Sequence, residues 1–216
     1  MSRFSTYIFD LDGTLIDSAP AILASFRQAF EQTRTAPVRP IESDIIGPPL
    51  KETLESLSGT TDPGTIERLS DAFKSAYDGG GLKATTAYEG VDRMLHDLRA
   101  AGKSLHIATN KRLHPTRAIL DMFGWRDLFD SVYALDMTEP RLPSKAAMIE
   151  RQLSELSLHA PETAYVGDRL EDGESADANA LAFFAATWGY GALTPDELSP
   201  GWTLLPDPDA KVLLSA

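Results

Sequence analysis

The sequence predicts an α/β protein with a Rossmann-like parallel sheet as its core and an inserted all-helical cap domain. Two observations lead to this prediction. Short apolar runs typical of buried strands alternate with longer segments in which apolar residues recur at helical spacing, which indicates a parallel sheet covered by helices on both faces. After the first of these runs the alternation stops for nearly seventy residues, which contain helical patterns and no convincing strand.

Five short apolar runs are predicted to be the strands of the core. They cover residues 6–9, 104–109, 132–135, 164–166 and 181–187. Between the later runs, apolar stripes such as the one over residues 91–98 predict amphipathic helices. The tail after Trp202 is predicted to be irregular.

The insertion is predicted to cover residues 16–83 and to form a helical cap, while residues 1–15 and 84–216 form the core. Ser18, followed by Ala19-Pro20, predicts a helix start with a capping hydroxyl and a proline in the first turn. Further apolar series continue at helical spacing until a flexible triplet of glycines closes the insertion.

Composition excludes several classes of function. The chain has 216 residues, with 20 Lys and Arg against 32 Asp and Glu, so its formal net charge is −12. An acidic chain is a poor candidate for binding nucleic acid or an anionic membrane, because both bind proteins that carry an excess of positive charge. There is no cysteine, which excludes disulfides, thiolate zinc sites and a cysteine nucleophile. We expect a cytoplasmic protein, since no secretory signal or membrane span is apparent.

The sharpest functional pattern is Asp10-Leu11-Asp12-Gly13-Thr14, directly after the first predicted strand. Ligands of open parallel sheets bind beyond the carboxyl ends of the strands. Carboxylates at positions i and i+2 of an extended chain lie on the same side of it. Two such anions are costly unless something compensates, for example a hard cation that takes oxygen ligands. The alternative is an Asx-type turn that closes the strand.

Two more polar clusters follow predicted strands. Thr109-Asn110-Lys111 could hold phosphate oxygens, or could instead begin a helix as an N-cap. Asp168 and Asp172 could extend the acidic site, or could merely complement a helix N-terminus. Lys145, on the helix before the fourth strand, is a candidate cation for the same place. Because a parallel sheet would bring all three strand ends to one edge, their coincidence favours a functional site.

At these residues the sequence resembles the haloacid dehalogenase-like (HAD) superfamily of phosphotransferases. The four motifs of that family match, in order, Asp10 to Thr14, Thr109, Lys145, and Asp168 with Asp172. The resemblance covers nearly the whole chain, and the chain looks most like the phosphoglycolate phosphatase-like branch. Segments that it shares with this branch include Ile46-Gly47-Pro48-Pro49-Leu50 and Trp188-Gly189-Tyr190-Gly191. It departs at Glu89 and Ala180, and Arg141 near Lys145 leaves two cations to choose between.

The resemblance implies an Mg²⁺-dependent phosphatase that works through an aspartyl-phosphate. Asp10 is expected to attack phosphorus. Asp12 is expected to protonate the leaving alkoxide and then to take a proton from the hydrolytic water. Thr109 and Lys145 are expected to hold the phosphoryl oxygens.

The resemblance also implies the metal site. The Mg²⁺ ligands are expected to be Asp10, the backbone carbonyl of Asp12, and Asp168. Asp172 is expected to orient a metal-bound water.

Substrate binding is expected to involve Asn110 and Lys111 in the core and Gly47 and Lys51 in the cap. A lysine in the first turn of a helix opposes the helix dipole, so Lys51 is a candidate for an anionic substrate. The alternative is a solvated lysine beside Glu52. Arg27 and Arg169 are weaker candidates for the same role.

Two other functions remain open at this stage. One is a sugar-phosphate mutase of the same fold, and the other is a non-catalytic member that binds a phosphorylated ligand or a partner protein. The expected partner is a small phosphorylated metabolite, and phosphoglycolate, a nucleotide, a sugar phosphate and phosphotyrosine are all compatible with the sequence. The protein is expected to be a monomer or a homodimer.

Overall fold

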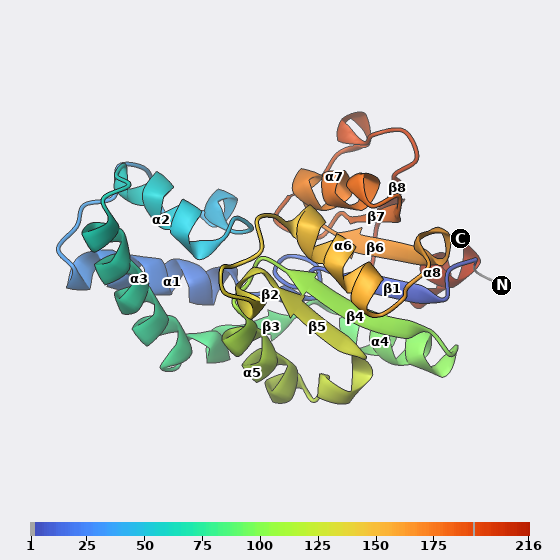
Figure 1. Ribbon diagram of the computed structural model, residues 1–216. Helices are drawn as coiled ribbons and strands as arrows, with labels where there is room; N and C mark the ends of the chain where they lie inside the picture. The colour runs from blue at the N-terminus through green and yellow to red at the C-terminus, as the bar shows by residue number, and fades with distance from the viewer. Residues whose placement is uncertain (1–2, 192) are drawn as a thin grey trace. The chain divides into compact units, whose positions relative to one another are not determined.

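The computed structural model describes residues 3–191 and 193–216 of the chain (Figure 1). It divides into two compact units. One holds the chain up to Ile16 and again from Ala87 to Ala216, and the other holds Asp17 to Thr86. None of the helices in the described ranges is long and apolar enough to cross a bilayer.

Within the described residues of the first unit, six strands form one parallel sheet in the order β5-β4-β1-β6-β7-β8. They are β1 (Thr6–Phe9), β4 (Ser104–Thr109), β5 (Ser131–Ala134), β6 (Thr163–Gly167), β7 (Ala182–Ala186) and β8 (Thr203–Leu205). After β1 the chain forms β4 and β5 on one side of β1, and it then forms β6, β7 and β8 on the other side of β1. The strand order therefore reverses beside β1. Ligands of doubly wound sheets bind beyond the strand ends at such a reversal. The predicted fold class is confirmed.

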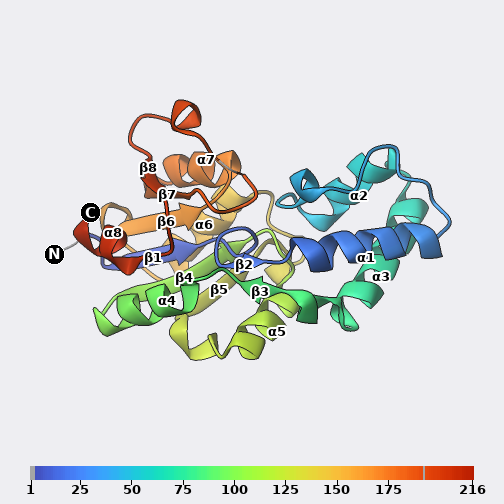
Figure 2. The same cartoon turned by 180° about the vertical axis from the view of Figure 1, so that it is seen from behind.

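The sheet is covered by helices on both faces, which explains why β1 is buried along its whole length. Figure 1 shows α6 (Lys145–Glu155) and α7 (Leu170–Ala178) in front of the sheet. The view from behind shows α4 (Val91–Ala100) and α8 (Ala210–Ser215) on the opposite face (Figure 2). A further helix, α5 (Leu113–Phe123), follows β4.

The tail after Trp202 is not irregular, so that prediction is wrong. It forms β8, which pairs with β7, and then α8. The Trp202 ring packs edge-on against Phe183, with ring centroids 4.9 Å apart. The Tyr7 hydroxyl donates to the Leu213 carbonyl at 2.6 Å. These contacts with distant parts of the chain order a segment too short to show a periodic pattern of its own.

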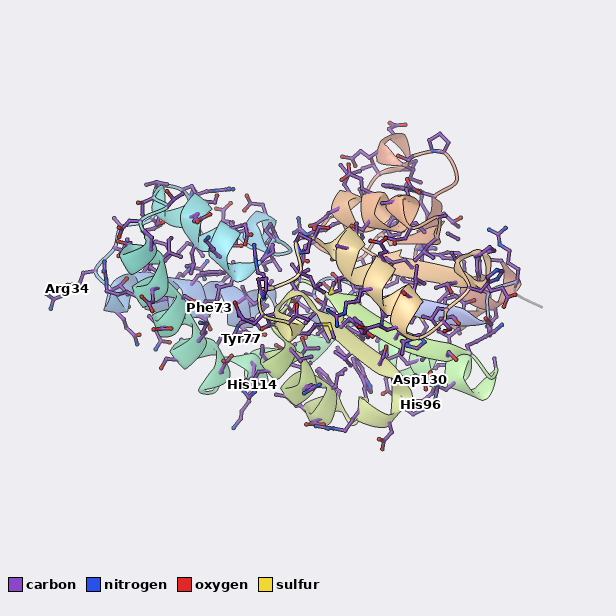
Figure 3. The ribbon with its side chains drawn as sticks, in the orientation of Figure 1. Arg34, Phe73, Tyr77, His96, His114 and Asp130 are labelled. Atoms are coloured by element: carbon purple, nitrogen blue, oxygen red, sulfur yellow. The ribbon has the colours of Figure 1, made fainter. Side chains whose placement is uncertain are left out.

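The second unit is helical, with α1 (Ala19–Gln32), α2 (Leu50–Ser58) and α3 (Pro63–Asp78). Its core contains a run of aromatic rings. The Phe73 ring lies 4.4 Å from that of Phe26 and 5.6 Å from that of Tyr77, centroid to centroid, and Figure 3 labels Phe73 and Tyr77. Each ring occupies the buried stripe that helical spacing predicts.

Two details at the start of this unit differ from the sequence predictions. Ser18 precedes α1, but its side chain makes no capping hydrogen bond. The carboxylate of Asp17 accepts from the backbone N–H of Ala19 at 3.1 Å instead. The chain passes between the units through β2 (Ile16–Asp17) and β3 (Thr86–Ala87), which pair as a two-stranded sheet. No strand was predicted at Ile16, because two residues are too few to show alternation.

Candidate active site

Asp10 and Asp12 follow β1 in a tight loop at the carboxyl edge of the sheet. Both residues are largely buried, with Asp10 5% and Asp12 9% exposed as whole residues. Gly13 allows this loop in two ways. Its φ is +88°, and a Cβ at this position would lie 2.5 Å from a carboxylate oxygen of Asp168. The glycine therefore lets the first strand end come close to the end of β6.

Three carboxylates form a compact buried cluster at this edge. One oxygen each from Asp10, Asp168 and Asp172 can be chosen so that all lie within 4.8 Å of one another. Asp168 and Asp172 are fully buried. Asp10 follows β1 and Asp168 follows β6, and these strands are hydrogen-bonded neighbours. The strand order therefore brings together residues more than 150 positions apart in the sequence.

Asp168 and Asp172 are held in place by hydrogen-bond donors. One oxygen of Asp168 accepts from the Thr14 hydroxyl at 3.3 Å, and the other accepts from the Gly191 N–H at 3.0 Å. Oδ2 of Asp172 accepts from the backbone N–H groups of Asp168 and Arg169 at 3.1 and 3.0 Å. Asp172 thus satisfies donors at the start of α7 and closes the loop that carries Asp168.

Lys145, the first residue of α6, supplies a positive charge to the cluster. Its Nζ lies 3.3 Å from Oδ1 of Asp10 and 2.5 Å from Oδ1 of Asp172. The residue is only 3% exposed. Arg141, the other candidate for this position, is exposed. Lys145 is therefore the cation that the structure places among the carboxylates.

The pKa values of the cluster show an excess of negative charge. Burial raises the pKa of Asp10 to about 8; Lys145 opposes this rise, and the carboxylates of Asp172, Asp168 and Asp12 add to it. Burial, with Asp172 next in importance, raises the pKa of Asp168 to about 6. Burial by itself lowers the pKa of Lys145, but Asp10 and Asp172 outweigh it and hold that pKa well above its usual value. One ammonium group does not balance three buried carboxylates.

A hard divalent cation fits this site. The candidate ligands are carboxylate oxygens, which are the donors that Mg²⁺ prefers. Oδ1 of Asp10 is buried and accepts no hydrogen bond from any described residue. A cation would lower the cost of ionising Asp10 and Asp168 together, because it offsets their repulsion.

The Thr109-Asn110-Lys111 segment lies at the end of β4, next to β1 in the sheet. The Thr109 side chain is buried, and its hydroxyl accepts from the Lys111 N–H at 3.2 Å. The Asn110 amide donates to Glu171 at 3.2 Å. Nζ of Lys111 lies 3.0 and 3.1 Å from the two carboxylate oxygens of Asp12. The structure thus places Asn110 and Lys111, both expected to bind substrate, against carboxylates of the protein.

The loop after β7 supports the site, in line with the sequence, which predicts that Trp188 to Gly191 form a structural turn at a strand end near the site. Nε1 of Trp188 donates to the Thr14 carbonyl at 3.0 Å. A Cβ at Gly189 would lie 2.2 Å from the Gly13 carbonyl oxygen, and the Gly191 N–H binds Asp168. The turn is therefore predicted from the sequence, whereas its individual contacts are seen only in the structure.

The expected substrate residues of the cap lie in the second unit. The Lys51 side chain is 65% exposed, and its Nζ lies 3.7 Å from Glu55 in the same helix. The φ of Gly47 is +122° in the turn before that helix. The Arg27 guanidinium donates to the Ile41 carbonyl at 2.9 Å. Arg169, in the core, is the N-cap residue of α7, and its backbone N–H donates to Asp172 at 3.0 Å. A role for these residues in substrate binding stays a prediction.

Comparison with known proteins supports the family resemblance. A sequence profile described as haloacid dehalogenase-like hydrolase matches residues 7–186. Phosphoglycolate phosphatase from Cereibacter sphaeroides (strain ATCC 17029 / ATH 2.4.9) is 32% identical over 188 residues, which cover 85% of each protein. The crystal structure of a predicted phosphatase from Clostridium acetobutylicum superposes with a TM-score of 0.82 at 26% identity and covers 93% of each chain. The predicted resemblance is confirmed.

Another relative has a different name. Tyrosine-protein kinase PtkA from Mycobacterium tuberculosis (strain ATCC 25618 / H37Rv) is 35% identical over 185 residues, which are 85% of this chain. The aligned part covers 62% of the PtkA sequence, so the chain spans less than two thirds of that relative. A PtkA structure matches with a TM-score of 0.78 at 32% identity, over 94% of each chain.

Gly189→Ala tests the close approach of the loop after β7. The added methyl group would meet the Gly13 carbonyl oxygen at 2.2 Å and Cβ of Asp168 at 2.4 Å, so the backbone must move. We expect the free energy of unfolding to fall by about 1–3 kcal/mol, as for other overpacked sites, and divalent-cation binding to weaken. Denaturant unfolding and calorimetric titration with Mg²⁺ would measure both effects.

Gly64→Ala is the matched control, because a Cβ there would lie no closer than 3.6 Å to its neighbours and the residue is in a helix. It should leave stability unchanged or slightly raised. Equal stability and Mg²⁺ affinity in Gly189→Ala and the wild type would contradict the proposed packing.

Stabilisation by Mg²⁺ should depend on pH. The folded protein holds protons on Asp10 and Asp168 more tightly than the unfolded chain does, because their pKa values rise from 3.8 to about 8 and about 6. The stability of the metal-free protein should therefore fall as pH rises from about 4 to about 8. Cation binding favours the ionised groups, so the rise in Tm with Mg²⁺ should be larger at pH 8 than at pH 5.

Differential scanning calorimetry at both pH values, with and without Mg²⁺, would measure this difference. Asp168→Asn removes one expected ligand and should reduce the rise at pH 8. A rise in Tm of the same size at both pH values would show that the cation does not bind this cluster.

Proposed function

Because the chain belongs to the haloacid dehalogenase-like hydrolase family, we propose that it is a divalent-cation-dependent phosphatase of a small phosphomonoester. One observation carries the proposal: the carboxylates of Asp10, Asp168 and Asp172 are buried around the Lys145 ammonium at the carboxyl edge of the sheet. A phosphomonoester is an anion, and it can approach an aspartate nucleophile only where other charges compensate. This cluster offers a place for that compensation.

Asp10 is proposed as the nucleophile. Its Oδ1 accepts no hydrogen bond from the described residues and lies 3.3 Å from the Lys145 ammonium, so the proposed nucleophile lies beside a positive charge. Attack on phosphorus forms a bond between Asp10 and phosphorus and breaks the ester bond, which leaves an alkoxide and an aspartyl-phosphate. This covalent step divides one difficult hydrolysis into two easier steps.

Asp12 is proposed as the general acid and base. In the first step its carboxyl group gives a proton to the ester oxygen as that oxygen leaves. In the second step its carboxylate takes a proton from water while the water oxygen attacks phosphorus. The bond between Asp10 and phosphorus then breaks, and inorganic phosphate leaves.

Lys145 and Thr109 are proposed to hold the phosphoryl oxygens. Lys145 lies against the nucleophile, and Thr109 ends the strand next to it. We propose that Asp10, Asp168 and the backbone carbonyl of Asp12 hold Mg²⁺, with Asp172 beside them. When bound, this cation supplies positive charge that offsets the charge of the phosphate and of the nucleophile.

The substrate class is proposed from the relatives. A phosphoglycolate phosphatase aligns over most of its length, which favours a small phosphorylated acid or a metabolite of similar size. The Lys51 ammonium, exposed at the start of α2, is proposed to attract the anionic end of such a substrate. Lys51→Ala should then raise KM and leave kcat unchanged.

The similarity to PtkA makes phosphoryl transfer to a protein tyrosine a second candidate. The same nucleophile and cation site could accept a phosphoryl group from a nucleotide and pass it to a phenol. Incubation with ATP and Mg²⁺, followed by detection of phosphotyrosine, distinguishes this activity from release of inorganic phosphate.

Asp10→Asn should abolish turnover. The amide is a far weaker nucleophile than the carboxylate, so we expect kcat to fall by at least about 10⁴-fold, as for other removed nucleophiles. The measurement is phosphate release with Mg²⁺ from a panel of phosphomonoesters that includes 2-phosphoglycolate.

Circular dichroism and calorimetry of Asp10→Asn should show an intact fold. Hydrolysis at the wild-type rate by this folded variant would overturn the assignment of the nucleophile. A wild-type protein that releases no phosphate from any member of the panel would overturn the proposed function itself.

A further inference from the structure

Lys111 has no part in the proposed attack on phosphorus or proton transfer, although its ammonium group lies in the site. Its Nζ lies 3.0 and 3.1 Å from the two oxygens of the Asp12 carboxylate. The side chains are 6% exposed for Lys111 and 11% for Asp12. Exposed ion pairs contribute little, but a buried ammonium group is costly unless an opposite charge lies against it. Because both side chains are buried, this ion pair differs from an ordinary surface contact.

The backbone that carries Lys111 is fixed on both sides. Its N–H donates to the Thr109 hydroxyl at 3.2 Å, at the end of β4. Two residues later, the N–H of Leu113 donates to Asp136 at 2.9 Å, where α5 begins. Since β4 and β1 are neighbours in the sheet, a side chain at position 111 can reach the loop that carries Asp12.

The two buried lysines of the site contact different carboxylates. Lys145 lies between Asp10 and Asp172, whereas Lys111 is paired with Asp12. Asp10 and Asp12 are the groups to which the mechanism assigns attack and proton transfer. Each of them therefore has a lysine of its own in this structure.

We propose that Lys111 is a positioning residue that holds the Asp12 carboxyl group for its work as acid and base, and that it affects turnover through Asp12 and not through substrate. The proposal rests on the proposed function. A proton-transfer group must lie within hydrogen-bond reach of the atom it serves, and small displacements cost large factors in rate. Two hydrogen bonds from one ammonium group restrict the rotation of the Asp12 side chain.

A double-mutant cycle tests whether Lys111 acts through Asp12. We expect Lys111→Met to lower kcat for an alkyl phosphate by about 10²-fold, the lower range for loss of acid–base catalysis. In an Asp12→Asn background the same substitution should change kcat by less than about threefold, because the group that it positions is already gone. Lys111→Arg, which retains the charge and the donors, should recover part of the activity.

A change of leaving group supplies a second readout. Nitrophenolate leaves without a proton, whereas an alkoxide needs one. Release of the leaving group in the first turnover by Lys111→Met should therefore be much slower for an alkyl phosphate and nearly unchanged for 4-nitrophenyl phosphate. A lysine that contacted the phosphate directly would instead slow both substrates or raise KM for both.

Two further variants control for loss of charge and for loss of the fold. Lys211→Met removes the same charge from an exposed position of α8 and should leave all rates unchanged. If Lys111→Met does not fold, the cycle is measured with Lys111→Gln, which keeps a hydrogen-bond donor for Asp12. The double variant of Lys111→Gln and Asp12→Asn carries no unpaired charge at these two positions.

The proposal is wrong if the losses from the two single substitutions multiply in the double variant, or if both leaving groups are slowed equally. Either result in an active protein leaves the phosphatase assignment intact and overturns the role of Lys111 alone. A wild-type protein that hydrolyses neither substrate overturns the proposed function and this role together.

Discussion

The electrostatic repulsion among buried carboxylates is the constraint on which the rest of this structure depends. Asp10, Asp168 and Asp172 are crowded at the carboxyl edge of the sheet, and burial raises the pKa values of Asp10 and Asp168. Lys145 offsets part of the repulsion from within the cluster. A site of this kind favours binding of a divalent cation, which offsets the repulsion among the carboxylates. The added positive charge then favours binding of an anion.

The fold supplies the rigid support that such a site needs. The order of the strands puts the end of β1 between the ends of β4 and β6, and each strand end carries one part of the site. The loop after β7 then closes around Asp168, with Gly189 placed where a side chain would collide with the chain. Groups that repel one another stay close because backbone hydrogen bonds and tight packing hold them, not because they attract.

Much of this arrangement could be predicted from the sequence, for a physical reason. Parallel strands meet at one edge, so Asp10, Thr109 and Asp168 could be grouped once their strands were recognised. The pairing of Lys111 with Asp12 could not, because it depends on how far a side chain reaches and not on spacing. The hydrogen bond to the Asp168 carboxylate is donated by the backbone N–H of Gly191, a group that side-chain patterns do not reveal. The strand and helix after Trp202 escaped detection, since contacts with distant residues order them.

The most direct test of the account is to find the phosphoryl group on the protein during turnover. The protein would be quenched in acid while it hydrolyses a phosphomonoester in the presence of Mg²⁺, and then reduced with borohydride, which converts an aspartyl-phosphate to homoserine. Mass spectrometry of the peptides should find homoserine at position 10 and nowhere else. Homoserine at another aspartate, or none at all in a protein that releases phosphate, would contradict the account.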